Sequence, residues 1–260
     1  MKKMVKVIAI VAVLVMALCC FAGCGKKSAV EKIQKAGKLT VLTEPGFAPF
    51  EYIDADGNIA GVDVEISKKV AAELGVEAEV IAMAFDGIIS AVQAGKGDIG
   101  AAGITATEER AQMVSFSTNY VDTGIYIIVP EGSEKVASPA DIGAGVAVGV
   151  QLGTTSDLFV SDTEAEVGRY TTVADAVVAL QAGKVDAVVA DELPAKDAVT
   201  NNPGLVIIDE PLTVEQYAIA VNKDNADLLE VVNKVVEEMV ESGEMAELIA
   251  EHMELAAAVG

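Results

Sequence analysis

Short apolar runs that are typical of strands alternate with amphipathic helical runs along most of the chain. The pattern predicts strands at 39–43, 76–83 and 98–102, and helices at 63–74 and 87–93. Strands that alternate with helices in this way favour parallel sheets with crossover helices. We therefore expect an α/β fold.

The last third of the chain continues with further strands and then two helices. Apolar runs predict strands at 126–129, 206–209 and 216–221, and a long helical pattern follows at 226–241. The stripe that this helix is expected to bury comprises Leu229, Val232, Val236 and Val240. Gly243 then ends the helix, and a short helix holding His252 follows. We expect this C-terminal part to pack back on the first half of the fold.

An eight-residue segment occurs twice in the chain. Residues 91–98 and 179–186 are identical at six of eight positions. Each copy has the pattern of a helix end, a glycine that stops the helix, and the start of a strand. Two lobes that share one helix–strand unit are the simplest explanation. The alternative is a chance recurrence, since helix stops of this kind are common.

The repeat also predicts where a ligand would bind. Gly103 lies five positions after the first copy, and Asp191 lies five positions after the second, so the two residues correspond. Each is expected to follow the carboxyl end of a strand. Ligands of open parallel sheets gather at those ends. We therefore expect a cleft between the lobes, with Gly103 on one wall and Asp191 on the other.

The first residues have the pattern of a secretory signal. Three early lysines precede an apolar run over 7–23, which ends in Ala22 and Gly23 before Cys24. A permanent membrane anchor is the alternative, but the run is short for a span of about 20 residues. Residues 21–24 resemble a bacterial lipoprotein cleavage box, except that Phe21 stands where leucine is common. Cleavage there would leave a lipid-bearing Cys24 at the mature N-terminus.

The charge of the chain excludes some partners. Because the leader holds three of the 18 basic residues, its removal changes the net charge from −22 to −25. Such an acidic protein repels nucleic acid and adheres poorly to anionic lipid, so a covalent anchor is reasonable. The mature chain would keep one cysteine and no internal disulfide, as expected for a domain that relies on its core.

An amino acid as ligand would require two kinds of binding group. Its α-carboxylate needs donors and its α-ammonium an acceptor, because each charge loses water on burial. Arg110 could supply a two-pronged donor and Asp191 an acceptor. Alternatively, Arg110 is a surface residue on a helix that Thr105 and Glu108 cap. Asp191 could likewise cap a helix that starts near Glu192.

Two further loops carry candidate contacts. Thr154 and Thr155 follow a predicted strand at 146–150 and open a helix, where they could be binding groups or ordinary caps. Phe47 and Phe85 could form an apolar sandwich around a ligand, although single aromatic residues are more often core side chains. Phe47 lies in the loop after the first strand, which favours a position in the cleft.

Taken together, several stretches resemble the amino-acid-binding proteins of ABC importers, the family 3 solute-binding proteins. These stretches are residues 43–51, 61–66, 85–89, 103–110, 116–117, 149–155 and 186–192. They cover nearly the whole mature chain in the right order. The resemblance implies a two-lobed periplasmic-binding-protein fold of type II. Each lobe is then a mostly parallel sheet with flanking helices, and two crossing strands join the lobes.

The resemblance also implies a domain organisation. Residues 1–23 are expected to form the signal peptide, and 24–37 a lipid-anchored tether with a short helix. Lobe 1 would comprise 38–124 and 211–260. Lobe 2 would comprise 125–210.

The same resemblance assigns roles to the carboxylate-binding side of the cleft. Arg110 would clamp the α-carboxylate of the ligand. Thr105 would help it, together with the backbone N–H groups of Thr154 and Thr155.

On the other side, Asp191 and the backbone carbonyl of Gly103 would hold the α-ammonium. Phe47 and Phe85 would flank the ligand side chain. Glu44 lies where relatives often have an acidic residue that touches a polar or cationic side chain.

The resulting expectation is an extracytoplasmic protein that captures an amino acid, with polar or basic ones favoured, and delivers it to an ABC-type permease. Some relatives that bind polar ligands have serine where this chain has Ala102. This difference leaves open which amino acid is bound. We expect a monomer without cofactor, metal, nucleic-acid partner or enzymatic activity. It would be attached by lipid at Cys24 to the outer face of the cytoplasmic membrane, or lie in the periplasm.

Two alternatives remain at this point. Some relatives of the fold resemble dehydratases, but the single histidine, His252, is expected to lie exposed at a helix end and outside the cleft. A sensory ectodomain would need a retained membrane span and a signalling domain. We expect neither.

Overall fold

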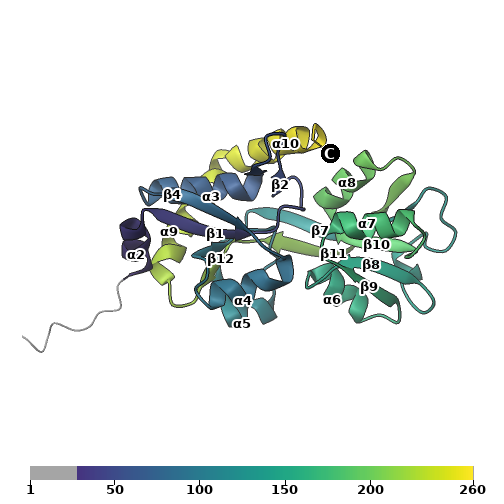
Figure 1. The fold of residues 1–260 in the computed structure, drawn as a ribbon. Helices are drawn as coiled ribbons and strands as arrows, with labels where there is room; N and C mark the ends of the chain where they lie inside the picture. Colours follow the sequence, from purple (N-terminus) through teal and green to yellow (C-terminus); the bar gives the residue numbers. More distant parts are fainter. Residues whose placement is uncertain (1–27, 260) are drawn as a thin grey trace, which may run out of the picture.

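Two five-stranded sheets organise the chain, and the computed structural model describes residues 28–259 of it (Figure 1). The first sheet has the strand order β4-β1-β5-β12-β6 and the second the order β11-β7-β10-β8-β9. The predictions of a signal peptide over 1–23 and of lipid attachment at Cys24 lie outside the described residues. Between residues 28 and 259, no helix combines the length and the apolar character needed to cross a membrane.

The first lobe is built on the first sheet. Its strands are β1 (Lys38–Thr43), β4 (Glu77–Ala82), β5 (Ile99–Gly100), β6 (Val114–Phe116) and β12 (Ala220–Asn222). β1 pairs in parallel with β4 and β5, whereas β12 lies antiparallel between β5 and β6. A small hairpin of β2 (Tyr52–Ile53) and β3 (Ile59–Ala60) precedes the second helix of the lobe.

The helices of this lobe match most of the sequence pattern. They are α2 (Ala29–Ala36), α3 (Val62–Glu73), the 3-10 turn η1 (Phe85–Gly87), α4 (Ile88–Gln93), α5 (Glu108–Met113), α9 (Ala226–Ser242) and α10 (Glu244–Ala257). The helices predicted at 63–74 and 87–93 are confirmed to within a residue, as are the strands predicted at 39–43 and 76–83. The strand predicted at 98–102 is shorter, because only Ile99 and Gly100 pair with their neighbours.

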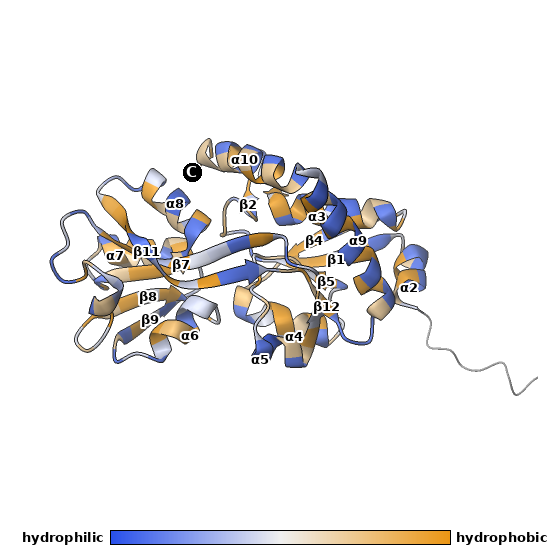
Figure 2. Ribbon diagram, turned by 180° about the vertical axis from the view of Figure 1, so that it is seen from behind, coloured by the Kyte–Doolittle hydropathy of each residue, from blue (hydrophilic) through white to orange (hydrophobic). Residues whose placement is uncertain are grey.

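The second lobe repeats this plan. Its strands are β7 (Val121–Pro130), β8 (Ala147–Gln151), β9 (Glu166–Tyr170), β10 (Ala187–Asp191) and β11 (Leu205–Tyr217). Its helices are the 3-10 turn η2 (Pro139–Asp141), α6 (Thr155–Ser161), α7 (Val173–Gln181) and α8 (Glu192–Asn201). β8 pairs in parallel with β9 and β10, and β7 and β11 extend the sheet in antiparallel orientation. Figure 2 shows hydrophobic residues along these strands, which the helices cover.

The eight-residue repeat is a structural repeat. Asp98 exchanges hydrogen bonds with Thr40 of the neighbouring strand: its N–H donates to the Thr40 carbonyl, and its carboxylate accepts from the Thr40 N–H, both at 2.8 Å. Asp186 makes the same pair of contacts with Ala147, at 2.7 and 2.8 Å. The aspartate of each copy therefore fixes the start of its strand against the next strand, and chance recurrence no longer explains the repeat.

Two long strands, β7 and β11, connect the lobes (Figure 1). They pair antiparallel along their length, with a register shift between Ile208 and Thr213. At the first lobe, the N–H of Tyr120 donates to the carbonyl of Tyr217 at 2.9 Å. The predicted strands at 126–129 and 206–209 are only the apolar parts of β7 and β11.

The single strand predicted at 216–221 is wrong. β11 ends at Tyr217 and β12 begins at Ala220, and the two strands belong to different sheets. Ala218 and Ile219 between them are buried as well. An uninterrupted buried run gives no sign of the point at which the chain passes from one lobe to the other.

The C-terminal helices pack on the first lobe as expected, with two corrections. In α9, Val232 and Val236 are buried, but Val240 is 44% exposed and Leu229 is half-buried. Leu228 and Met239 lie in the core instead. The stripe is therefore turned towards Met239. His252 in α10 is buried rather than exposed, because α10 packs on α3 and its ring nitrogen Nδ1 lies 3.0 Å from the Tyr52 hydroxyl.

Candidate functional site

Eight of the nine predicted binding residues line one narrow cavity between the lobes. They are Phe47, Phe85, Gly103, Thr105, Arg110, Thr154, Thr155 and Asp191. The ninth, Glu44, lies in the loop that leads from β1 to Phe47. The structure thus brings together residues that are up to 144 positions apart in the sequence, from Phe47 to Asp191.

Arg110 spans the boundary between the lobes. Its side chain is 9% exposed; Nη1 donates to the Thr105 carbonyl at 2.8 Å, and Nη2 donates to the Gly153 carbonyl at 3.0 Å. The Phe85 ring lies 5.3 Å from its Cζ, within cation–π range. The alternative of a surface arginine on a helix capped by Thr105 is wrong, because Thr107 is the N-cap of α5.

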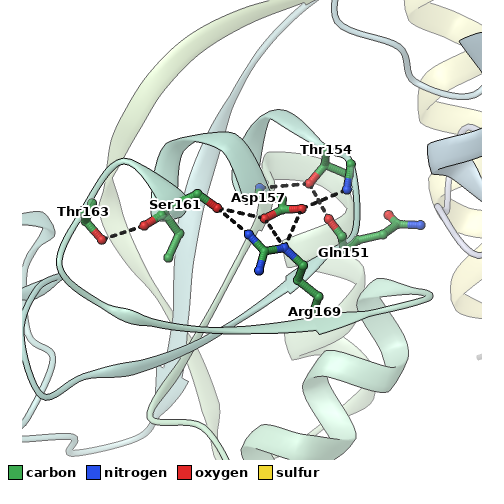
Figure 3. A network of polar contacts seen from close by, with 8 residues as sticks. Gln151, Thr154, Asp157, Ser161, Thr163 and Arg169 are labelled. Carbon is green, nitrogen blue, oxygen red and sulfur yellow. Dashed lines mark hydrogen bonds and ion pairs between the residues drawn. The ribbon is translucent and has the colours of Figure 1, made fainter.

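The loop before α6 forms the facing wall, and a polar network holds it (Figure 3). Thr154 is the N-cap of the helix, and its hydroxyl donates to the Gln151 carbonyl at 2.8 Å. The Asp157 carboxylate accepts from the Gly153 N–H at 3.0 Å and forms an ion pair with Arg169 at 2.9 Å. The Gly153 carbonyl that Arg110 contacts is therefore fixed from within its own lobe.

Asp191 lies at the carboxyl end of β10, as the repeat predicted. It is 4% exposed and occupies the N-cap position of α8, as the sequence also allowed, but its side chain makes no cap hydrogen bond to the helix. It accepts a short hydrogen bond from the Tyr217 hydroxyl. Burial, and next the charge of Glu215, raise the pKa of Asp191 to about 7, while the Tyr217 hydrogen bond and Arg110 act in the opposite direction.

Glu215 is a site residue that the sequence interpretation missed. One oxygen of its buried carboxylate accepts from the hydroxyls of Thr105 and Thr155, the latter at 2.7 Å, and the other accepts from Thr213 at 3.1 Å. A residue of the connecting strand β11 thus binds one hydroxyl from each wall. The available signal was spacing: Glu215 and Tyr217 are two apart in a strand and share a face.

Gly103 is required by its surroundings. Its φ of +52° is in the left-handed region, and a Cβ there would lie 2.5 Å from Cε1 of Phe47. Phe47 itself is buried against Phe50 and Tyr217. The backbone of Gly103 and the ring of Phe47 therefore form one continuous surface of the cavity.

Glu44 faces the second lobe beside the cavity. Its carboxylate accepts from Nε2 of Gln151 at 3.0 Å, and Gln151 also donates to the Thr171 carbonyl at 3.0 Å. Burial raises the pKa of Glu44, the Gln151 hydrogen bond lowers it, and the charge of Asp175 raises it. Gln151 is thus a second residue that the sequence interpretation left without a role.

The charges of the site are unbalanced. One guanidinium, that of Arg110, lies near the carboxyl groups of Asp191 and Glu215, and a third buried carboxyl group, that of Glu44, contacts Gln151. Burial lowers the pKa of Arg110, and the charges of Glu215 and Asp191 offset part of that shift. The site therefore offers one place for an anionic group and more than one for cationic groups.

Comparisons with known proteins agree with this geometry. The sequence model of a protein family, the bacterial extracellular solute-binding proteins, family 3, matches residues 39–254. The chain belongs to this family.

Two relatives within the family illustrate its range. The L-cystine-binding protein TcyJ of Escherichia coli (strain K12) is 31% identical over 242 residues, which cover 90% of this chain and 91% of the relative. The arginine-binding extracellular protein ArtP of Bacillus subtilis (strain 168) is 32% identical over 232 residues, which cover 86% and 89%.

Solved structures of family 3 proteins share the two-lobed, type II fold. A mutant of ArgBP from T. maritima superposes with a TM-score of 0.83 at 40% identity, covering 87% of this chain and 99% of that one. The substrate-binding protein AbpA from Streptococcus pneumoniae, bound to L-arginine, gives a TM-score of 0.83 at 35% identity, with the same coverage. The expected fold class is confirmed, and each sheet combines a parallel centre with antiparallel strands.

The raised pKa of Asp191 predicts how stability depends on pH. A carboxyl group whose pKa is higher in the folded than in the unfolded protein binds more protons when folded between those two values. Without amino acid, the free energy of unfolding should therefore fall as the pH rises from about 4 to about 7. Asp191→Asn should flatten this slope, as measured by urea unfolding at pH 5, 6, 7 and 8.

Part of the slope should persist in this variant, because burial also raises the pKa of Asp63 to about 6. Parallel pH profiles for the wild type and Asp191→Asn would show that Asp191 titrates at its ordinary value.

Proposed function

We propose that this protein captures a basic amino acid in the cavity between its lobes, with arginine as the first candidate. The observation that carries the proposal is the placement of a buried guanidinium, Arg110, and a buried carboxylate, Asp191, in one cavity. A zwitterion matches this pair, because its carboxylate can accept from Arg110 and its ammonium can donate to Asp191 and to the Gly103 carbonyl.

The negative excess of the site supports a cationic ligand. Arg110 alone can bind the α-carboxylate, whereas Asp191, Glu215 and Glu44 together offer more negative charge than one α-ammonium can match. A ligand with a cationic side chain would supply the missing positive charge near Glu44. Relatives named for binding arginine and structures with bound arginine point the same way.

Hinge motion is part of the proposal. Arg110 and Asp191 are buried, and the walls of the cavity touch where Arg110 donates to Gly153. A ligand can therefore reach them only when the lobes separate. β7 and β11 are the connections about which the lobes would open, and contacts from both lobes would favour closure over the ligand. We propose that an ABC-type permease then receives the amino acid.

No observation favours an enzymatic function. The single histidine, His252, packs against Tyr52 and does not line the cavity. Capture and delivery of a solute account for the site.

The first test is a calorimetric screen of the twenty amino acids against the wild type and Arg110→Ala. We expect arginine to bind the wild type with the highest affinity. In Arg110→Ala the affinity should fall about 100-fold or more, because the α-carboxylate would be buried without its charged donor. Arg110→Lys should lie between them, since lysine keeps the charge but loses the two-pronged geometry.

Lys135→Ala is the matched control for this loss. Lys135 forms an exposed ion pair with Asp186 in the second lobe and does not line the cavity. Its removal should leave the affinity unchanged. Absence of binding by all twenty amino acids to the wild type would refute the proposed function.

A second test separates the side-chain preference from amino-acid binding as such. In Glu44→Gln we expect the affinity for arginine to fall about tenfold or more, while the affinity for glutamine stays the same or rises. The reason is that the substitution removes charge near Gln151 and leaves Arg110 and Asp191 unchanged. Calorimetric titration of both ligands measures the ratio; equal losses for both would argue against a role of Glu44 in selecting cations.

We further propose that Cys24 carries the lipid that holds the protein at the outer face of the membrane. Support comes from the small residues before Cys24 and from its place in the sequence, four positions before Ser28, which caps α2 at the start of the first lobe. Expression of the full chain with Cys24→Ala should move the protein from the membrane fraction to the soluble fraction. A variant that stays in the membrane fraction would contradict this attachment site.

A further inference from the structure

Asp63 is a buried carboxylate that does not line the cavity but hydrogen-bonds a residue that does. It lies in the first turn of α3 and is fully buried. Its Oδ2 accepts from the Gly103 N–H at 2.8 Å, and its Oδ1 accepts from the Tyr120 hydroxyl at 2.7 Å. Burial of a carboxylate is costly unless such donors replace water. The position of Asp63 is therefore tied to both partners.

The first partner belongs to the proposed ammonium site. Gly103 uses its N–H for Asp63, which leaves its carbonyl for the ligand. The backbone of Gly103 also lies against the ring of Phe47, so it cannot shift without moving that ring. Asp63 thus holds the residue whose carbonyl would accept from the α-ammonium.

The second partner leads to the other ammonium acceptor. Tyr120 precedes β7, and its N–H donates to the Tyr217 carbonyl at 2.9 Å. The rings of Tyr120 and Tyr217 pack with centroids 6.2 Å apart. The hydroxyl of Tyr217 in turn donates to Asp191. A continuous series of contacts therefore runs from Asp63 in the first lobe to Asp191 in the second.

Glu51 lies beside Asp63 and completes the cluster. Both oxygens of the Glu51 carboxyl are buried, and this carboxyl lies within hydrogen-bonding reach of the Asp63 carboxyl. Two neighbouring buried carboxyl groups do not both ionise, and burial together with the charge of Asp63 raises the pKa of Glu51 well above its ordinary value. Burial and the charge of Asp63 therefore favour the uncharged form of Glu51. Its backbone pairs with Phe47, so it supports the same wall of the cavity.

We propose that Asp63 is a positioning residue of the amino-acid site: it holds Gly103 directly, and it holds Asp191 through Tyr120 and Tyr217. The inference rests on the proposed function and extends it to residues that the ligand does not touch. It predicts that loss of the Tyr120 hydroxyl weakens ligand binding although the cavity walls keep their side chains.

The test compares two tyrosine variants with one readout of stability and one of affinity. Tyr120→Phe removes the hydroxyl that donates to Asp63, and Tyr52→Phe removes the buried hydroxyl that contacts His252 at 3.0 Å, away from the cavity. Both should lower the urea midpoint of unfolding. Only Tyr120→Phe should weaken arginine binding, about tenfold by calorimetry, whereas Tyr52→Phe should stay within about twofold of the wild type, since it leaves the Asp63 contacts intact.

A third variant tests the neutral state of Glu51. Glu51→Gln replaces a neutral carboxyl with a neutral amide of the same size, so arginine affinity should stay within about threefold of the wild type. A folded Glu51→Gln protein with a larger loss would show that Glu51 acts as an anion, which would overturn the proposed charge of the pair.

The outcomes distinguish this inference from the proposed function. Absence of amino-acid binding by the wild type would refute both. Wild-type binding together with equal affinities of Tyr120→Phe and Tyr52→Phe would refute the connection from Asp63 through Tyr120 to Asp191 and leave the proposed function standing. Asp63→Asn can be added, but the test does not depend on its folding.

Discussion

The burial of opposite charges on facing walls is the constraint on which the rest of the structure depends. Arg110 and Asp191 each lose most of their contact with water, which costs several kcal/mol per ion unless polar groups replace it. The carbonyls of Thr105 and Gly153 do so for Arg110, and the hydroxyl of Tyr217 does so for Asp191. These partners lie in loops and strand ends where the lobes meet. The contact of Arg110 with Gly153 crosses from one lobe to the other, so the proposed closure would also satisfy part of this charge.

The parts of the fold that depend on local pattern could be predicted from the sequence. Alternation of strands and helices indicated the α/β class, and the repeated segment indicated two lobes. The reason is visible at Asp98 and Asp186, each of which is tied by the same two hydrogen bonds to the next strand. The offset between the copies also related Gly103 to Asp191, and both line the cavity, although Asp191 is the last residue of β10 and Gly103 lies three residues beyond β5.

The parts that depend on contacts between distant elements could not be predicted in this way. Nothing around Glu215 indicates that its carboxylate would meet hydroxyls from both walls, because Thr105 and Thr155 lie far from it in the sequence. His252 is buried only because α10 folds back on α3, and its partner Tyr52 is 200 residues away. Local periodicity reports which face of an element is apolar, but not which polar groups the packing of elements will bring together.

The connecting strands unite the site with its proposed motion. Tyr120 lies at the start of β7 and Tyr217 at the end of β11, and both hydroxyls donate to buried carboxylates, Asp63 in one lobe and Asp191 in the other. Glu215 on β11 binds a hydroxyl from each wall. A change in the angle between the lobes must therefore alter the hydrogen bonds that align the ligand-binding groups. In the motion proposed above, the hinge and the binding site would share residues, so that occupancy of the site and the relative position of the lobes would be coupled.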